Sequence, residues 1–235
     1  MRTDRAAVLE AVLALACLLG APPLALAQSE SPDAPEYRPP MRGAPASRVG
    51  GATRGASDAR PLLAVIAPDH TGLTLREQPD LWWYVSQPLA ARLEITVIND
   101  DAVQPLVELT AQSVGSPGLQ RIRLAEQGVK LKPNVEYRWF VGLVVDPKQR
   151  SSDIIASGTI QYLTAAPGAL GERLKTARAE ERYRVLAEGG VWYDAIDALI
   201  EQMRARPGDA ALRKHLGELL KQVGIAEQVR ASILK

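Results

Sequence analysis

The clearest pattern of hydrophobic and polar positions lies between residues 135 and 145. Apolar side chains occupy every second position there, namely Val135, Tyr137, Trp139, Val141, Leu143 and Val145. Alternation of this kind places all of them on one face of a β-strand. Pro133 and Asn134 mark a turn just before it. The pattern predicts one long strand with a single buried face.

Shorter patterns of the same kind recur on both sides of this strand, separated by turn residues such as Pro117-Gly118. We expect strands at residues 62–66, 73–76, 82–84, 92–97, 106–109, 121–124 and 154–163. Short strands at roughly ten-residue spacing are typical of an antiparallel β-sandwich.

After Pro167 the apolar period lengthens from that of a strand to that of a helix. We expect helices at residues 170–186, 192–203 and 210–223, with a candidate fourth at 225–234. Gly189-Gly190, Pro207 and Gly224 stand where these helices end, and Asp209 is a fitting N-cap for the third.

The entry into the long strand, Leu131-x-Pro133-x-x-x-Tyr137-x-Trp139, resembles the penultimate strand of an immunoglobulin-like or fibronectin type III sandwich. In such sandwiches a tyrosine near the start of that strand bonds back to upstream backbone. We therefore expect a mainly β chain with a C-terminal α part. An immunoglobulin- or fibronectin-III-like antiparallel β-sandwich (61–166) is followed by a three- to four-helix subdomain (167–235).

The stretch from Ala187 to Gly224 resembles one tetratricopeptide-type unit. A single unit of that kind cannot bury its own faces. We therefore expect the helices to pack on the sandwich or on each other, in one cooperative body. Trp192 and Phe140 are candidates for that junction, Phe140 because it lies on the opposite face of the long strand from Trp139.

The first 27 residues have the pattern of a secretory signal peptide. Arg2 and Arg5 precede an apolar run from Ala11 to Leu19, and Ala25-Leu26-Ala27 forms a small-residue cleavage site before Gln28. The alternative is a membrane anchor, but the run is too short to span ~30 Å of hydrocarbon. We expect a mature protein in the periplasm or outside the cell.

Cys17 is the only cysteine, and it lies inside this signal. A lipoprotein processing site would have leucine three residues earlier, where this chain has Ala14. We therefore expect no lipid on Cys17, and a mature chain without a thiol, a disulfide or a thiolate metal site.

Residues 28–60 are rich in Pro, Gly, Ser, Ala and Arg and contain almost no large apolar side chain. Such a segment cannot repay its ordering entropy, so we expect a disordered leader. The net charge of +1 gives no argument for nucleic acid or an anionic membrane as partner. We expect neither a nucleic-acid partner nor stable membrane insertion after cleavage, and the oligomeric state stays open.

Candidate catalytic chemistry is sparse. His70 and His215 are the only histidines, and no ligand set with metal-site spacing is visible. Asp194 and Asp197 share one helix face, where two carboxylates could flank a bond or bind a cation. They could equally be acids at a helix start, favoured there by the dipole. No P-loop, nucleophile elbow, zinc-protease or dinucleotide motif occurs, so we expect no cofactor and no metal.

The most suggestive cluster is Trp82-Trp83-Tyr84. On a strand, Trp82 and Tyr84 point one way and Trp83 the other. One face belongs to the core, while the other either presents an aromatic surface to sugar rings or a protein, or is covered by the helices. The candidate interaction surface comprises Trp82, Trp83, Tyr84, Phe140 and Trp192.

Several short motifs together resemble a bacterial secreted family known as domain of unknown function 928. They are Gly51–Gly55, Leu62–Pro68, Gly72–Pro79, Trp83-Tyr84, Pro117-Gly118, Leu131–Trp139, Asp146-Pro147, Gly158–Ile160 and Gly190–Ala195. The resemblance implies secretion and a sandwich, and it brings no catalytic residue. Similar members carry two cysteines where this chain has Ala56 or Ser57 and Val145, so a disulfide that the resemblance would imply cannot form here.

These observations lead us to expect a non-catalytic binding or scaffolding module of the bacterial cell envelope, with a protein partner. One alternative is a carbohydrate-binding module that uses Trp82 or Trp83. The other is a hydrolase or lyase of an envelope polymer that uses carboxylates such as Asp194 and Asp197.

Overall fold

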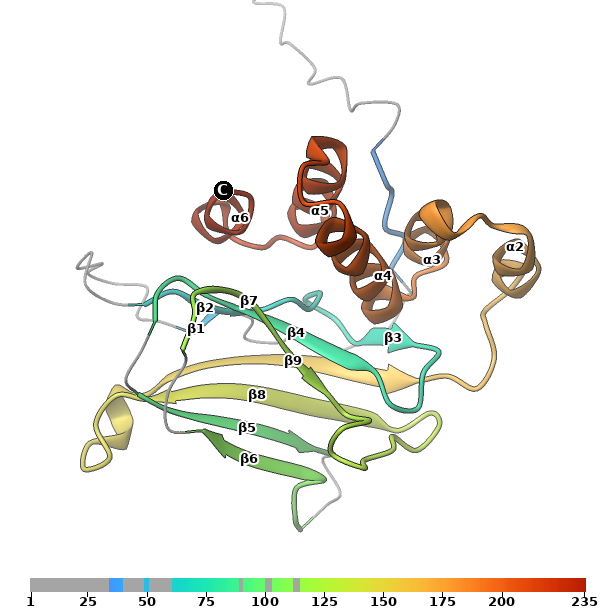
Figure 1. The fold of residues 1–235 in the computed structure, drawn as a ribbon. Coiled ribbons are helices and arrows are strands. Elements are labelled where there is room, and N and C mark those ends of the chain that lie inside the picture. Colours follow the sequence, from blue (N-terminus) through green and yellow to red (C-terminus); the bar gives the residue numbers. More distant parts are fainter. Residues whose placement is uncertain (1–33, 40–48, 51–60, 89–90, 100–102, 112–114) are drawn as a thin grey trace, which may run out of the picture. The chain divides into compact units, whose positions relative to one another are not determined.

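The computed structural model describes residues 34–39, 49–50, 61–88, 91–99, 103–111 and 115–235. The expected signal peptide and most of the expected leader lie outside these ranges. Among the described residues, two β-sheets precede five C-terminal α-helices (Figure 1). No described helix is both long enough and apolar enough to cross a membrane.

The first sheet has the strand order β1-β2-β4-β7, and all of its neighbours are antiparallel. Its strands are β1 (Val49–Gly50), β2 (Leu63–Val65), β4 (Asp80–Val85) and β7 (Gly118–Arg123). The expected strands are present here, and only the two-residue β1 had no counterpart in the sequence pattern.

The second sheet has the order β3-β9-β8-β5-β6. Its strands are β3 (Gly72–Thr74), β5 (Arg92–Ile98), β6 (Val107–Ala111), β8 (Glu136–Val144) and β9 (Ile154–Tyr162). A short 3-10 helix, η1 (Arg150–Ser152), joins β8 to β9. The edge strand β3 runs parallel to β9, whereas the other pairs are antiparallel as expected.

The helices follow β9 in sequence. They are α2 (Leu170–Thr176), the 3-10 turn η2 (Ala179–Glu181), α3 (Arg182–Glu188), α4 (Trp192–Ala205), α5 (Ala210–Gln222) and α6 (Glu227–Ile233). The carboxylate of Asp209 accepts the N–H groups of Ala211 and Leu212, which confirms the expected N-cap of α5.

The expectation of one continuous helix from 170 to 186 is wrong. The chain leaves the helix at Ala177 and Arg178, whose backbone is extended, and resumes it in η2 and α3. The break lets α2 fold back so that Leu170 reaches the end of α3. A Cβ on Gly189 would lie 2.5 Å from Leu170 Cδ2, so this packing requires the glycine.

The long strand β8 has the expected buried face. Tyr137, Trp139, Val141 and Leu143 are all at most 3% exposed. The backbone N–H of Lys132 donates to Tyr137 Oη at 3.1 Å, so the tyrosine does bond to upstream backbone. Val145 is an exception at 56% exposed, because the strand ends at Val144.

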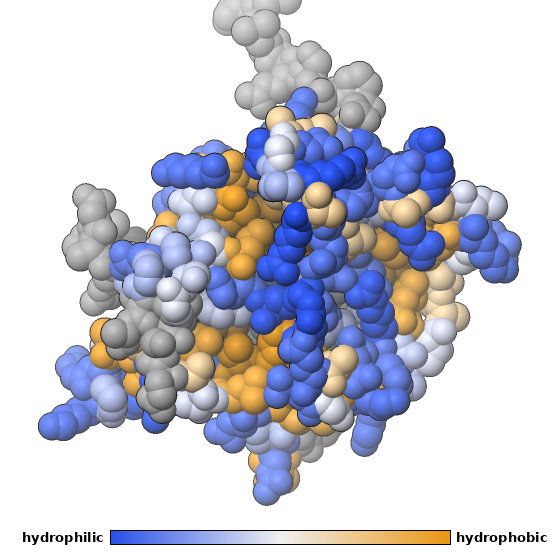
Figure 2. Space-filling model, viewed as in Figure 1, coloured by the Kyte–Doolittle hydropathy of each residue, from blue (hydrophilic) through white to orange (hydrophobic). Residues whose placement is uncertain are grey.

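The helices lie on the side of the four-stranded sheet that faces away from β8, β5 and β6 (Figure 1). Helix α4 makes the main contacts, with β3 and β4, and α6 touches β7. Figure 2, in the same view as Figure 1, shows hydrophobic patches beside a band of hydrophilic side chains on the face that is turned to the viewer.

The first turn of α4 enters the core between the sheets. Tyr193 Oη accepts the indole N–H of Trp139 at 2.9 Å and donates to the carbonyl of Thr159 at 2.8 Å. A Cβ on Gly72 would lie 2.6 Å from the Tyr193 ring, and one on Gly158 would lie 2.8 Å from Trp139 Nε1. Both glycines are therefore needed for the close approach.

Removal of the Tyr193 hydroxyl tests whether helices and sheets unfold together. Tyr193→Phe leaves the indole N–H of Trp139 without its partner and removes one bond to the carbonyl of Thr159, which costs ~1–3 kcal/mol. We expect a loss of that size in the free energy of unfolding, in one cooperative urea transition.

The matched control is Tyr162→Phe, which removes a hydroxyl from a half-buried tyrosine at the end of β9. A loss below ~0.5 kcal/mol in Tyr193→Phe, or two separate transitions in the wild type, would contradict the prediction.

Candidate functional site

The junction between α4 and the sheets is polar as well as aromatic. The indole N–H of Trp192 donates to the carbonyl of Ile66 at 3.0 Å, in the segment that leads from β2 to β3. Trp192 is fully buried. Its predicted position in the junction is confirmed, and its side chain is not part of an exposed interaction surface.

Asp194 and Asp197 lie together in this junction, both 6% exposed. Asp194 accepts the N–H of Leu75 at 3.0 Å, and its other oxygen is 3.5 Å from Arg76 Nε. Asp197 accepts the indole N–H of Trp82 at 3.1 Å and a bond from Arg76 Nη1 at 2.6 Å. Each carboxylate oxygen of the pair therefore already has a partner within the protein.

Burial and these contacts shift the pKa values of Asp194 and Arg76. Burial raises the pKa of Asp194, while Thr74 and Arg76 oppose that shift. Burial would lower the pKa of Arg76, but the charges of Asp194 and Asp197 outweigh it and raise that pKa. The arrangement is a charged clamp that fixes α4 onto the turn between β3 and β4.

A third acid, Asp80, extends the clamp along β4. Its Oδ2 lies 3.1 Å from Arg121 Nη1 and 3.7 Å from Arg123 Nε, and Arg121 also bonds Glu201 of α4 at 2.6 Å. Burial, together with the negative charge of Asp197, raises the pKa of Asp80 from 3.8 to about 6, although Arg123 and Arg76 oppose the shift.

The aromatic strand is covered on both faces. Trp82, Trp83 and Tyr84 are 1%, 3% and 4% exposed. The guanidinium groups of Arg121 and Arg204 lie over the Trp82 ring at 4.9 and 4.4 Å from its centroid, in the geometry of cation–π contacts. The hypothesis of an exposed aromatic surface on this strand is wrong, because the second sheet and the helices cover it.

Phe140 does not lie in the junction with the helices. Its neighbour Trp139 faces Tyr193, and consecutive strand residues point to opposite faces. Phe140 is half-buried and stands outside the hydrophobic core. The expectation for Phe140 is therefore wrong, because the strand face that contacts α4 carries Trp139 and not Phe140.

The two histidines hold local contacts. His70 Nδ1 lies 3.0 Å from Asp69 Oδ1, and its Nε2 lies 2.9 Å from Tyr37 Oη. His215 is 5% exposed and bonds Tyr183 Oη at 2.7 Å, so it is a buried residue of the helical layer. No group of three potential metal ligands occurs within the described ranges.

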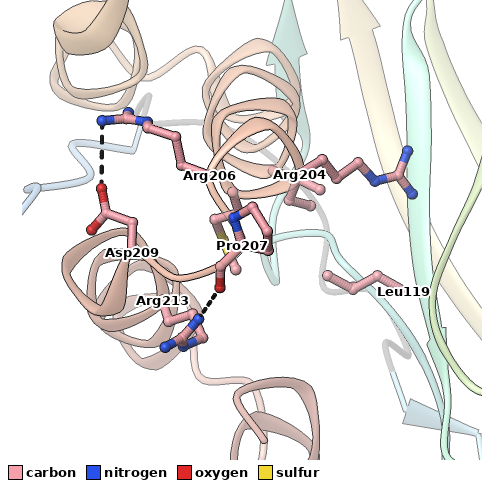
Figure 3. A pocket seen from close by; sticks show the side chains of 8 residues that line it. Leu119, Arg204, Arg206, Pro207, Asp209 and Arg213 are labelled. Carbon is pink, nitrogen blue, oxygen red and sulfur yellow. Dashed lines mark hydrogen bonds and ion pairs between the residues drawn. The ribbon is translucent and has the colours of Figure 1, made fainter.

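A pocket of about 300 Å³ lies between the end of α4, the start of α5 and strand β7. It is lined by Leu119, Ile200, Met203, Arg204, Arg206, Pro207, Asp209 and Arg213. In Figure 3, Leu119 projects toward the helices from the sheet side, Arg204 points toward the sheet and Arg206 points away from it.

Three arginines and one aspartate give the pocket a net positive charge. Arg206 Nη1 lies 3.4 Å from Asp209 Oδ2, and Arg213 donates to the carbonyl of Pro207 (Figure 3). The pocket could not be predicted from the sequence, because its residues come from two helices and a strand with no common motif. The only signal was the run of arginines around Pro207.

One part of the segment that we expected to be a disordered leader packs against the folded body. Tyr37 is 7% exposed and packs edge-on against Trp192 at 4.9 Å between ring centroids. It is the only aromatic residue in 28–60, and that is the signal that could have separated it from its surroundings.

The raised pKa of Asp80 predicts a specific dependence of stability on pH. The folded state binds the Asp80 proton more tightly than the unfolded state, whose pKa is near 3.8. Protonation therefore stabilises the fold, and this contribution falls as the pH rises from about 4 through about 6. The stability of the wild type relative to Asp80→Asn should decline over that interval.

Urea unfolding at steps of half a pH unit, between about pH 4.5 and 7, measures this difference. The steps cover most of the interval from about 4 to 6 in which the decline is expected. Asp146→Asn removes an exposed carboxylate from the turn after β8 and serves as the control. A wild-type minus Asp80→Asn difference that stays flat or rises with pH would contradict the assignment.

Comparison with known protein families gives one match. Residues 49–233 match the family described as Domain of Unknown Function (DUF928). No curated protein sequence matches the chain. The matched region runs from β1 to the end of α6 and so includes both sheets, the charged clamp and the pocket. The chain therefore belongs to the DUF928 family.

Proposed function

We propose that this protein is an exported, non-catalytic binding module of the cell envelope, which takes a partner protein in the pocket between α4, α5 and β7. The observation that carries the proposal is the pocket itself: an apolar hollow bordered by three arginines. It lies beside the Trp82–Tyr84 strand, since Leu119 pairs with Tyr84 across β4 and β7.

The lining of the pocket specifies the chemistry of the partner. Leu119, Ile200 and Met203 offer apolar surface, while the arginines favour a carboxylate. A partner segment with an apolar side chain next to an acidic group or a C-terminal carboxylate meets both requirements. Arginine at the edge of an apolar pocket is also a residue type enriched at binding hot spots.

The alternatives have less support from the contacts. A hydrolase that uses Asp194 and Asp197 would need carboxylate oxygens available to substrate, whereas their oxygens bind Leu75, Arg76 and Trp82. A carbohydrate-binding module would need an accessible aromatic ring at Trp82 or Trp83, and both are buried. The proposal assigns no catalytic residue, cofactor or metal.

We further propose that residues 61–166 form an immunoglobulin- or fibronectin-III-like sandwich and that 167–235 form a helical subdomain on it. The strand order supports this proposal. If β2 and β4 are strands A and B, then β7 is E, and β9-β8-β5-β6 follows the order G-F-C-C′. The bond from Lys132 N–H to Tyr137 Oη lies where such folds have a tyrosine corner. The tetratricopeptide-like interpretation of 187–224 stays a prediction.

Two pocket variants test the binding function. Met203→Asp places a charge in the apolar floor, and Arg213→Glu reverses one of the three arginines. Lys221→Glu is the matched control, because it makes the same charge change at an exposed position of α5 outside the pocket.

We expect a partner captured from an envelope extract by the wild type and by Lys221→Glu, and at least tenfold less of it with either pocket variant, since each truncated contact of a hot spot costs ~1–2 kcal/mol. Thermal melts of all variants check folding. Equal capture by all variants would contradict the proposed site, and turnover of a glycan or peptide that disappears in Asp194→Asn would favour an enzyme.

Export is a separate part of the proposal and rests on the pattern of residues 1–27. The intact mass of the protein recovered from a bacterial periplasm should correspond to a chain that begins at Gln28. A mass that retains Met1, or one that includes a diacylglycerol on Cys17, would contradict cleavage at Ala27.

A further inference from the structure

Residues 34–39 cross the helical layer between α3 and α5, where they are drawn in blue in Figure 1; we call them the strap. Pro35 and Tyr37 are buried, whereas Glu36 and Arg38 are exposed. This alternation is that of an extended chain lying on a surface. The strap therefore presents every second side chain to the folded body, as a bound peptide does.

The side-chain amide of Gln222 binds the strap backbone through both its nitrogen and its oxygen. The Nε2 group of Gln222 donates to the carbonyl of Pro35 at 2.7 Å, and its Oε1 accepts the N–H of Tyr37 at 2.7 Å. The N–H of Arg38 donates to the carbonyl of Ala187 at 3.2 Å. Gln222 itself is exposed, at the last turn of α5. Its contacts are with the strap backbone and not with the core.

Tyr37 fills a pocket of matching polarity. Its ring packs edge-on against Trp192 and lies nearly parallel to His70, at 5.7 Å between centroids. Its hydroxyl lies 2.9 Å from His70 Nε2. Asp69 Oδ1 lies 3.0 Å from Nδ1, so in the tautomer with its proton on Nδ1 the ring donates to Asp69 and accepts from the Tyr37 hydroxyl at Nε2.

The outward side chains interact mainly with each other, with a smaller effect of the Glu188 charge on Arg38. Glu36 and Arg38 pair with each other at 2.7 Å, and both side chains are 61% exposed. The folded body therefore recognises a proline, a tyrosine two residues later, and the backbone between them. Main-chain hydrogen bonds combined with pockets for alternate side chains are the general mode of extended-peptide recognition.

We propose that the cleft formed by His70, Ala187, Trp192 and Gln222 is a binding site for extended Pro-x-Tyr segments, and that the strap is a ligand which the chain supplies to itself. A partner protein with an exposed Pro-x-Tyr segment is the competing occupant. Its binding displaces Tyr37, and the partner's own segment then covers Trp192. The strap thus sets a minimum affinity that a partner must exceed in order to bind.

This site is independent of the arginine pocket. The cleft uses the first turn of α4 and the last turn of α5, whereas the pocket uses the end of α4 and the start of α5. A tethered ligand competes at an effective concentration on the order of 1 mM. A free peptide of moderate affinity therefore binds the wild type only in large excess, and binds at lower concentration once the strap loses its anchor.

The test uses the full chain and a fluorescent, end-capped peptide with the sequence of residues 34–39, Ala-Pro-Glu-Tyr-Arg-Pro. Fluorescence anisotropy should show at least tenfold tighter binding to Tyr37→Ser than to the wild type. Arg38→Ala, which changes an exposed strap residue, should behave as the wild type does. Adding Gln222→Ala to Tyr37→Ser, or replacing the peptide tyrosine by alanine, should abolish the binding.

A second measurement applies to the wild type alone, so it does not depend on folding of Tyr37→Ser. Excess peptide should accelerate hydrogen exchange at the backbone amides of Tyr37 and Arg38, and the alanine peptide should not. Equal affinity for wild type and Tyr37→Ser, or unchanged exchange at both amides, would overturn the proposal.

Strap exchange between two copies is the remaining outcome. If the wild type forms dimers that Tyr37→Ser lacks, a second copy supplies the segment in place of a different protein, and the competing-partner proposal is overturned. Neither measurement involves the arginine pocket, so failure of this site leaves the proposed function to its own test.

Discussion

The Tyr193 hydroxyl is the constraint on which the arrangement of sheets and helices depends. It satisfies a donor from β8 and an acceptor from β9 while belonging to α4. Two strands and a helix must therefore meet at one atom. Because these groups are buried, a displaced helix leaves the indole N–H of Trp139 unpaired in the core and removes a bond to the carbonyl of Thr159. The glycines at 72 and 158 make room for this meeting, so backbone shape and hydrogen bonding impose the same geometry.

The charged clamp follows from that placement of α4. Once Tyr193 is fixed, Asp194 and Asp197 are carried into a buried position, where Arg76 and the indole of Trp82 satisfy them. The sequence predicted correctly that the two acids share a helix face. It could not predict their partners, which lie more than one hundred residues away along the chain. Spacing within a helix is local information, whereas the difference between a catalytic and a structural carboxylate depends on tertiary contacts.

The same limit separates the parts of the fold that could be predicted from those that could not. Strict alternation predicted β8 and its buried face, because a period of two leaves only one face for the core. The parallel pairing of β3 with β9 could not be predicted, since nothing in the residues of either strand encodes a distant neighbour. Phe140 was misplaced for a related reason: alternation shows that it opposes Trp139, but not which of the two faces the helices. Tyr37 was missed because the composition of its segment outweighed one aromatic residue.

The contacts of the strap also fix an order of events during biosynthesis. Residues 34–39 leave the ribosome early, whereas Ala187 and Gln222, which bind them, are in the last quarter of the chain to be made. The strap must therefore wait, unbound, until α3, α4 and α5 exist and have docked on the sheets. At ~5–20 residues per second this interval lasts on the order of ten seconds or more. Throughout it, Tyr37 is accessible to chaperones, proteases and modifying enzymes that cannot reach it in the finished protein.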